Sequence, residues 1–371
     1  MGESKNAKNR NGVVKVLYIG NYKDGTGWGD AALNNIIAMD AAGIDVVPRA
    51  ITYKDNVDFH NSKVLELEKK DADGCDVCIQ HVLPHLYSYN SAFKRNIGFL
   101  ASETLDLKYS NWNYYASIMD EIWVPSNACK KSLDITKPVH VIPHSLDISE
   151  YEDTESGNKI ENLIGSYNFV FVGEFIERKN LKDLLRAFHT EFKSWENVNL
   201  YIKTSGADLS IVQNFCNQIK RGLKVSENYK EEIIISGKLD KKDYVSTMAQ
   251  CHCFVMPSHG EAFCIPALEA TVLGLQCLWT DGIGVEDFAV GKAVESYQEP
   301  CFGGVSSLRN LYTAKNKWLT IKVDKLQQEM RRCFEEYKRN ELKTLDENHV
   351  QKYSHEYVGN MIKQRLEEVE K

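Results

Sequence analysis

Two glutamates separated by seven residues, Glu261 and Glu269, are the first feature of the sequence that suggests chemistry. From Phe254 to Gly274 the chain reads FVMPSHGEAFCIPALEATVLG: an apolar run, a small polar loop and Pro266, a residue favoured in the first turn of a helix. Helix N-termini bind anions through exposed N–H groups, and carboxylates accept hydrogen bonds from paired hydroxyls. The stretch therefore predicts a phosphate site beside carboxylates that bind a sugar and a ribose. The alternative is a solvated Glu261 and a Glu269 that only complements the helix dipole.

A glycine-rich loop, GNYKDGTGWGD, follows the first apolar run and precedes a helix expected from about Ala31. Its glycines do not give the spacing G-x-G-x-x-G, and Trp28 is too bulky for close approach of a pyrophosphate. We therefore do not expect a dinucleotide cofactor in this loop.

His81 ends the run IQH, at the edge where open parallel sheets bind ligands. It is either a site residue or a structural histidine held by hydrogen bonds. With Cys75, Cys78 and His85 it also gives a metal-like C-x2-C-x2-H-x3-H spacing. A strand would point these side chains to opposite faces, so we expect ordinary thiols and no zinc. The ten cysteines of the chain are expected to be free or buried thiols, not disulfides.

The elements that must position these residues are short apolar runs separated by helix-length segments, a pattern that predicts parallel sheets covered by helices. The runs expected to form strands are 13–19, 44–47, 77–79, 97–100, 121–124 and 139–142, then 169–172, 200–202, 233–235, 253–256 and 277–279. We predict two doubly wound α/β domains, residues 12–150 and 160–345, joined by a polar linker at 150–159. Helices are expected at 324–338 and 355–370, and the C-terminal helix, within 352–371, is expected to complete the first domain.

Composition narrows the class of protein. The 371 residues include 45 Lys and Arg against 52 Asp and Glu, a net charge of −7, so no overall positive field favours nucleic acid as a partner. The sequence has no run near the roughly 18 apolar residues that span a bilayer, and its polar start lacks an apolar signal core. We expect a cytoplasmic protein without a transmembrane segment.

The stretch around Glu261 resembles the E-x7-E region of the GT4-type retaining glycosyltransferases, with Pro257, Ser258, Glu261, Phe263, Pro266, Glu269 and Ala270 in register. The resemblance implies that Glu261 contacts the hydroxyls of the donor sugar and that Glu269 binds the ribose. It also implies that the amides of Ala262, Phe263 and Cys264 contact the sugar and phosphate. Ala262 and Cys264 stand where that family usually has glycine, which allows closer approach of the backbone.

A second stretch similar to that family, FVFVGEFIERKNLKDLLRAF from Phe169 to Phe188, carries a basic turn before an amphipathic segment. Lys179 matches a lysine that neutralises the donor diphosphate, and Glu174 stands where an arginine is usual. Arg178 is expected to supply that charge from the neighbouring position. The alternative for Arg178 and Lys179 is a pair of exposed charges at a helix entry.

Weaker matches extend the resemblance over most of the chain. VPSNACKKSL and VIPHSLD resemble the end of the first domain, and the backbone at Gly237 and Leu239 is expected to contact the base. The resemblance also implies that the glycine-rich loop faces the cleft, so Thr26, Gly27 and Trp28 are expected on the acceptor side and His81 near the reacting sugar.

The resemblance implies the GT-B architecture, in which two Rossmann-like domains face a cleft. The expected enzyme is a retaining, hexosyltransferase-like glycosyltransferase that needs neither cofactor nor metal. It would use a nucleotide-sugar donor and a carbohydrate, glycan or glycoconjugate acceptor. Glu261, Arg178, Lys179 and His81 are the expected catalytic residues. The alternatives are a nucleotide-sugar epimerase and an inactive nucleotide-binding subunit of the same fold.

Overall fold

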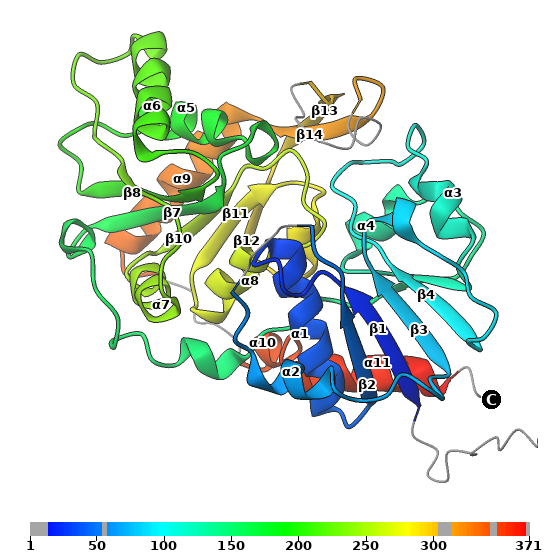
Figure 1. Cartoon of the computed structure of the whole chain (residues 1–371). Coiled ribbons are helices and arrows are strands. Elements are labelled where there is room, and N and C mark those ends of the chain that lie inside the picture. The colour runs from blue at the N-terminus through cyan, green and yellow to red at the C-terminus, as the bar shows by residue number, and fades with distance from the viewer. Residues whose placement is uncertain (1–13, 54–57, 303–312, 342–346, 369–371) are drawn as a thin grey trace, which may run out of the picture.

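The computed structural model describes residues 14–53, 58–302, 313–341 and 347–368. Within these ranges it has two six-stranded sheets and one two-stranded sheet (Figure 1). Residues 12–13, 342–345 and 369–371 of the expected domains and terminal helix lie outside the described residues, as does Val13 of the first expected strand.

The first sheet is entirely parallel and has the order β2-β1-β3-β4-β5-β6. Its strands are β1 (Lys15–Gly20), β2 (Asp45–Ala50), β3 (Val77–His81), β4 (Arg95–Phe99), β5 (Glu121–Val124) and β6 (Val139–Val141). The strands expected in the first half of the chain are thus confirmed. The order reverses between β1 and β3, because β2 lies on one side of β1 and the later strands lie on the other.

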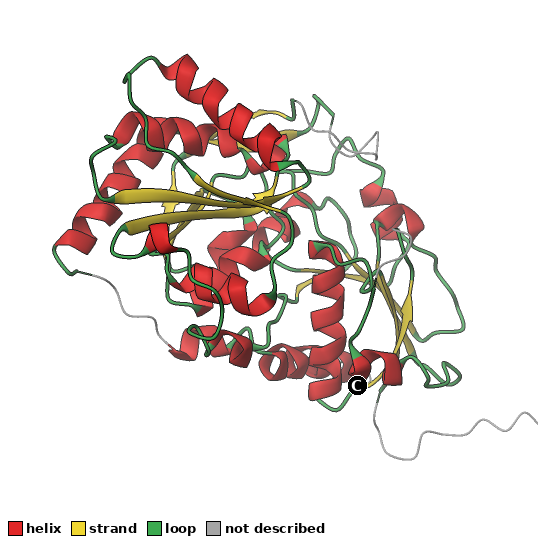
Figure 2. Ribbon diagram, turned by 60° about the vertical axis from the view of Figure 1, so that its left-hand side comes forward, coloured by secondary structure: helices red, strands yellow, loops and turns green. Residues whose placement is uncertain are grey.

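Helices cover both faces of this sheet, as a doubly wound fold requires. One buried cluster packs the sheet against α1 (Gly27–Ala41), α2 (Ser62–Leu67) and α11 (His355–Glu367). The other packs it against α3 (Trp112–Ser117) and α4 (Asn127–Ser132). Figure 2 shows the helices on either side of the strands.

The second large sheet is also parallel, with the order β12-β11-β10-β7-β8-β9. Its strands are β7 (Tyr167–Glu174), β8 (Val198–Ser205), β9 (Ile233–Ser236), β10 (Cys253–Met256), β11 (Gln276–Thr280) and β12 (Gly291–Val294). The five expected strands are confirmed, and β12 extends the edge beyond them. The order reverses between β7 and β10. The antiparallel pair β13 (Ser296–Pro300) and β14 (Lys317–Ile321) was not predicted from the sequence.

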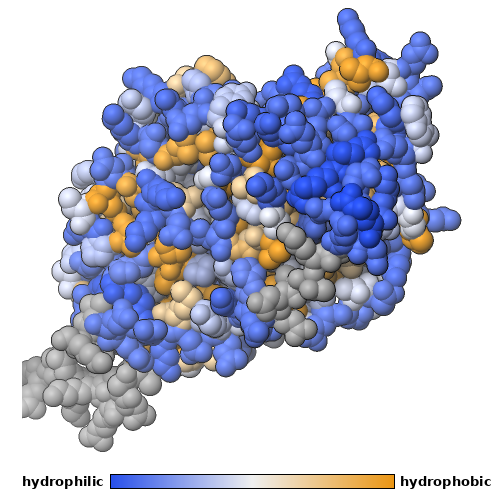
Figure 3. Space-filling model, turned by 180° about the vertical axis from the view of Figure 1, so that it is seen from behind, coloured by the Kyte–Doolittle hydropathy of each residue, from blue (hydrophilic) through white to orange (hydrophobic). Residues whose placement is uncertain are grey.

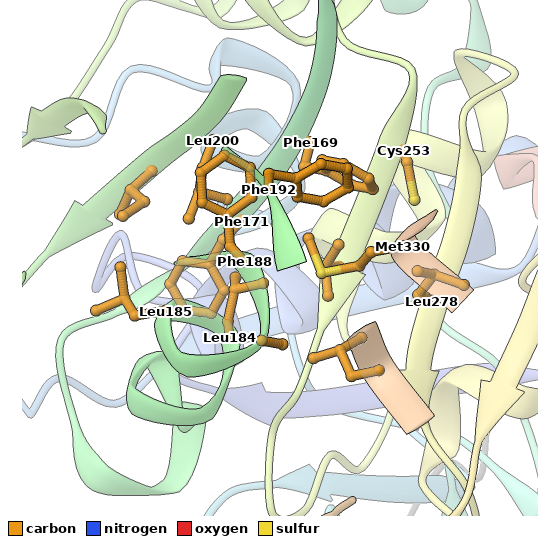
Figure 4. Close-up of a cluster of buried hydrophobic side chains, with 14 of the residues drawn as sticks. Phe169, Phe171, Leu184, Leu185, Phe188, Phe192, Leu200, Cys253, Leu278 and Met330 are labelled. Carbon is orange, nitrogen blue, oxygen red and sulfur yellow. The ribbon is translucent and has the colours of Figure 1, made fainter. Parts of the chain in front are cut away.

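Alternation along β7 explains how this sheet is buried on both faces. Phe169 and Phe171 pack against α5 (Leu181–Glu191), α6 (Leu209–Leu223) and α9 (Val323–Lys338), in the cluster that Figure 4 shows. Val170 points to the other face, against α7 (Lys241–Ala249) and α8 (Ile265–Val272). Successive residues of a strand point to opposite faces, so one apolar run supplies two cores.

The C-terminal part of the chain returns to the first sheet through α10 (Glu347–Gln351) and α11. Val358, Ile362 and Leu366 of α11 are buried in the same cluster as β1 and α1. A Cβ at Gly359 would lie 2.0 Å from the Ala38 carbonyl oxygen, so the absence of a side chain lets the two helices touch. In Figure 1, α11 accordingly runs beside α1.

Among the described residues, five short 3-10 helices connect the larger elements: η1 (Pro84–Leu86), η2 (Ile148–Tyr151), η3 (Glu161–Leu163), η4 (Glu177–Lys179) and η5 (Gly284–Asp287). All ten cysteines are free and buried, as expected. On the face seen in Figure 3, hydrophobic side chains lie in small separate groups among hydrophilic ones. None of the described helices is both long and apolar enough to cross a membrane.

Candidate functional site

A cavity of about 500 Å³ opens between the two domains, at the carboxyl ends of both parallel sheets. The first domain lines it with residues at or just after the carboxyl ends of β1, β3, β4 and β6. The second lines it with residues at or just after the carboxyl ends of β7, β8 and β10. These strands include both pairs that flank a reversal of strand order, β1 with β3 and β7 with β10. Open α/β sheets bind ligands in the crevice at such a reversal.

The loop after β10 leads directly into α8, which begins at Ile265 and has Pro266 in its first turn. Cys264 precedes the helix with φ +79°, a left-handed conformation that non-glycine residues rarely adopt. The helix ends at Val272, and Gly274 follows with φ +77°. The helix start and stop expected from Pro266 and Gly274 are therefore confirmed.

An ion cluster joins this loop to the basic turn after β7. Glu261 Oε1 lies 2.7 Å from Lys179 Nζ and 2.9 Å from Arg178 Nη1. Arg178 also donates to the Gly260 carbonyl oxygen at 2.6 Å. Burial opposes ionisation of Glu261, but Lys179 and Arg178 outweigh it and lower the pKa of its carboxyl. The side chains of Arg178 and Lys179 are each only 13% exposed, and that of Glu261 5%, so the alternatives of solvated charges are wrong.

The backbone holds the same two loops in register. His259 donates its N–H to the Arg178 carbonyl oxygen at 2.8 Å, and the Ser258 hydroxyl donates to the same oxygen at 3.0 Å. A Cβ at Gly260 would lie 1.8 Å from the Glu103 carbonyl oxygen, so only glycine lets the β10 loop touch the first domain here. These contacts fix Glu261 and Arg178 relative to both domains.

Glu269 lies on α8 within a second polar cluster. Tyr151 donates to Oε1 at 2.5 Å, Tyr244 donates to Oε2 at 2.6 Å, and Lys241 Nζ lies 3.3 Å from Oε1. Burial first, and then the charge of Glu269, raise the pKa of both phenols, so they stay protonated as donors. Across the cavity, burial and the charge of Glu269 raise the pKa of Asp30, on α1 of the first domain.

The first-domain wall of the cavity starts with the N-terminus of α1. The helix begins at Gly27, not near Ala31 as expected, because the Thr26 side chain caps it by accepting from the Gly29 N–H at 3.1 Å. Thr26, Gly27 and Trp28 line the cavity. The Trp28 ring centroid lies 5.9 Å from that of His81.

His81 takes part in a buried aromatic stack. Its ring stacks on Phe99 at 4.3 Å and on His144 at 6.0 Å, and Nδ1 lies 2.7 Å from the hydroxyl of Tyr18. Burial, and then His144, lower the pKa of His81. Burial lowers the pKa of His144 to about 3. Both rings are therefore neutral near pH 7.

The comparisons with known proteins agree with this architecture. Residues 155–294 match the family model of glycosyl transferases group 1. A glycosyltransferase from Rickettsia africae ESF-5 superposes with a TM-score of 0.64 at 14% identity, over 97% of this chain and 99% of that one. The Anabaena protein Alr3699/HepE, solved in complex with UDP, gives 0.62 at 13% identity, over 95% and 99% of the two chains.

The chain has the GT-B fold.

The sequence match to a curated relative covers less of this GT-B protein than the structural superpositions do. The uncharacterized glycosyltransferase YqgM of Bacillus subtilis is 26% identical over 173 residues, 46% of this chain and 45% of that protein. The match thus spans less than half the length of the curated relative. Together with the family match over residues 155–294, it makes part of this chain similar to group 1 glycosyltransferases.

The GT-B cavity brings together most of the residues singled out from the sequence. It is lined by Thr26, Gly27, Trp28, His81, Arg178, Lys179, Glu261, Ala262, Phe263, Cys264 and Glu269. Gly237 and Leu239 do not line it, although the Gly237 carbonyl oxygen accepts from Lys203, a lining residue. In the part of the chain that the structure describes, no three His, Cys, Asp or Glu side chains are grouped to hold a metal ion, including those at Cys75 and Cys78.

Several residues of the cavity and its surroundings were not predicted as site residues from the sequence. Those that line it are Glu103, Asp30, His144 and Lys203, and those that support Glu269 are Tyr151 and Tyr244. Glu103 follows β4 at the same sheet edge as His81, and this position after a strand could have identified it from the sequence. Tyr151 lies in the segment expected to be a linker, where no local pattern marks it.

Proposed function

We propose that this protein is a retaining glycosyltransferase that transfers a sugar from a nucleoside diphosphate sugar to a carbohydrate, glycan or glycoconjugate acceptor. The main observation that supports this proposal is the cavity between the domains, which is lined by the Arg178, Lys179 and Glu261 cluster and by the N-terminus of α8. Cations and helix N–H groups at one point form a site for an anionic leaving group.

The donor diphosphate would bind beside Lys179 and the first turn of α8. Negative charge develops on the leaving phosphate as its bond to the anomeric carbon breaks, so fixed positive groups at that point stabilise the transition state. Lys179 has three N–H donors, and its bond to Glu261 uses one of them. These protein cations support a reaction that needs no metal, which EDTA treatment would leave unaffected.

The two carboxylates would hold the rest of the donor. Glu261 is fixed by Arg178 and Lys179 and would accept hydrogen bonds from sugar hydroxyls. Glu269 would bind the ribose hydroxyls while Tyr151 and Tyr244 hold its carboxylate in place. Retention of configuration is supported by the resemblance of the segment from Pro257 to Ala270 to retaining enzymes.

The acceptor would enter from the first-domain side of the cavity. Trp28 offers an aromatic face to a sugar ring, and Thr26 lies beside it at the start of α1. His81 is held by Tyr18 and is neutral, so it would act through hydrogen bonding and not as a cation.

The test is a transfer assay on a panel of nucleoside diphosphate sugars and glycan acceptors, with NMR of the anomeric proton of the product. Lys179→Met should lower kcat by roughly a hundredfold or more, the scale for losing one fixed transition-state donor. The matched control is Lys182→Met, which removes an equal charge from a partly exposed lysine paired with Glu177. Equal loss in both variants would contradict the assignment. Isomerisation of the donor in the absence of an acceptor would indicate an epimerase. Tight binding of the donor without turnover would indicate an inactive subunit.

A further inference from the structure

The cavity continues beyond the phosphate region, along the carboxyl edge of the second sheet. β8 lies next to β7, and its last residues Lys203, Thr204 and Ser205 line the cavity together with Glu174 at the end of β7. Neighbouring strands are about 4.8 Å apart, so β8 lies about 10 Å from β10 across the sheet. This spacing leaves room for a ribose between a phosphate held at β10 and a base held at β8.

Glu174 and Lys203 project from the same face of the sheet. Val172 pairs with Lys203 and Glu174 pairs with Ser205, so Glu174 and Lys203 are diagonal neighbours on adjacent strands. Val172 packs against the cluster that contains α7 and α8, which identifies the face. The ion pairs found among the described residues do not include one between Glu174 and Lys203, although both line the same cavity. The cavity wall thus contains a cation and a carboxylate that do not pair with each other.

The environment of Lys203 favours a ligand with an acceptor atom. Its ammonium donates to the carbonyl oxygens of Gly237 at 2.5 Å and Thr204 at 3.4 Å. Partial burial lowers the pKa of this lysine, and the described ion pairs give it no carboxylate partner. A half-buried ammonium that contacts only carbonyl groups gains from a further acceptor.

We propose that Lys203 and Glu174 select a nucleotide base that carries a keto oxygen next to a ring N–H, which is the edge of uracil and guanine. Lys203 donates to the keto oxygen, and the Glu174 carboxylate accepts from the adjacent N–H. Adenine and cytosine present the reverse pattern, an amino donor next to a ring acceptor, and would set a donor against Lys203 and an acceptor against Glu174. This inference rests on the proposed function and names the class of donor.

Binding of UDP, GDP, ADP, CDP and inorganic pyrophosphate to the full chain, measured by calorimetry, tests the proposal. UDP or GDP should bind about tenfold or more tightly than ADP and CDP, the scale for paired hydrogen bonds that tell one base from another. Comparison of UDP with GDP then identifies the base. Lys203→Met should weaken the binding of the preferred nucleotide by about tenfold and leave the binding of pyrophosphate unchanged. Lys203→Arg, which keeps a donor, should retain the preference.

The control is Lys292→Met, which removes an exposed lysine from β12 at the far edge of the same sheet and should change no affinity. Thermal melts without ligand show whether each variant is folded. If Lys203→Met does not fold, the binding of the same nucleotides to Glu174→Gln and to the wild type tests the proposal instead.

Two results would overturn the base assignment and leave the donor site standing. One is ADP or CDP binding as tightly as UDP and GDP. The other is an equal loss of affinity for all nucleotides and for pyrophosphate in Lys203→Met, which would indicate that Lys203 binds the phosphates. Failure of every nucleotide to bind the wild-type chain would overturn the proposed function as well.

Discussion

Arg178 and Glu103 join the two domains across the cavity, with Arg178 Nη2 2.8 Å from Glu103 Oε1. Arg178 belongs to η4 of the second domain, and Glu103 follows β4 of the first. Because Arg178 also pairs with Glu261, its guanidinium lies between two carboxylates. An incoming diphosphate would share Arg178 with both of them.

Glu103→Gln should therefore tighten the binding of nucleoside diphosphates. Removing one negative charge a few ångströms from the phosphates is worth about 1 kcal/mol, or roughly fivefold in Kd. Calorimetry on the wild type and the variant measures it, with Glu177→Gln as the control for an exposed charge in the same turn as Arg178. Weaker binding in Glu103→Gln would mean that Glu103 positions Arg178 and does not compete with the ligand.

Glu269→Ala should lower both stability and turnover. The substitution leaves the hydroxyls of Tyr151 and Tyr244 without their carboxylate partner, at a cost of about 2 kcal/mol in the free energy of unfolding. Turnover should fall by roughly a hundredfold as the ribose contact is lost. Denaturant unfolding and the transfer assay measure the two effects. Tyr244→Phe removes one of the hydrogen bonds and should cost about 1 kcal/mol; full turnover in Glu269→Ala would exclude its role.

Cys264→Gly should be more stable than Cys264→Ala. Position 264 has φ +79°, a conformation that disfavours residues with a Cβ by about 1–2 kcal/mol, so glycine relieves strain that alanine keeps. We expect a difference of about 1 kcal/mol in the free energy of unfolding by denaturant titration. Ala267→Gly is the matched control within α8, where glycine should instead destabilise by about 1 kcal/mol. Equal stability of the two position-264 variants would show that the backbone there is unstrained.

His144→Phe should make the protein less sensitive to acid. Burial lowers the pKa of His144 to about 3 in the folded state, against about 6.5 in the unfolded chain. The unfolded state therefore binds a proton first, and stability falls as pH drops below about 6.5, by about 1.4 kcal/mol per unit from this residue.

Between pH 7.5 and 5, the free energy of unfolding of His144→Phe should thus improve relative to the wild type by about 2 kcal/mol. Denaturant unfolding across this range measures the change. His60→Phe, at an exposed position, controls for the loss of an imidazole. Parallel pH profiles for the wild type and His144→Phe would refute the burial argument.

Local sequence patterns were sufficient for the strands β1 to β11 and for the α8 segment, but not for β12, β13 and β14. Apolar runs such as Phe169 to Val172 predict buried strands because alternate residues must face two cores. Pro266 and Gly274 predicted the ends of α8, because proline restricts φ to a value that suits the first turn of a helix and glycine permits the positive φ that follows a helix end. The start of α1 was misplaced because its cap, Thr26, stands among glycines that look like a longer loop.

The sequence by itself determined which residues stand in the loops after β7 and β10, and that these loops follow strands of a parallel sheet. Only the tertiary structure decided that β7 and β10 are neighbours, that Glu103 reaches Arg178 from the other domain, and that Tyr151 supports Glu269. Hydrophobic periodicity is a local property of the chain, whereas strand order depends on how whole sheet faces and their helices pack. Contacts between residues far apart in sequence therefore appear only in the folded chain.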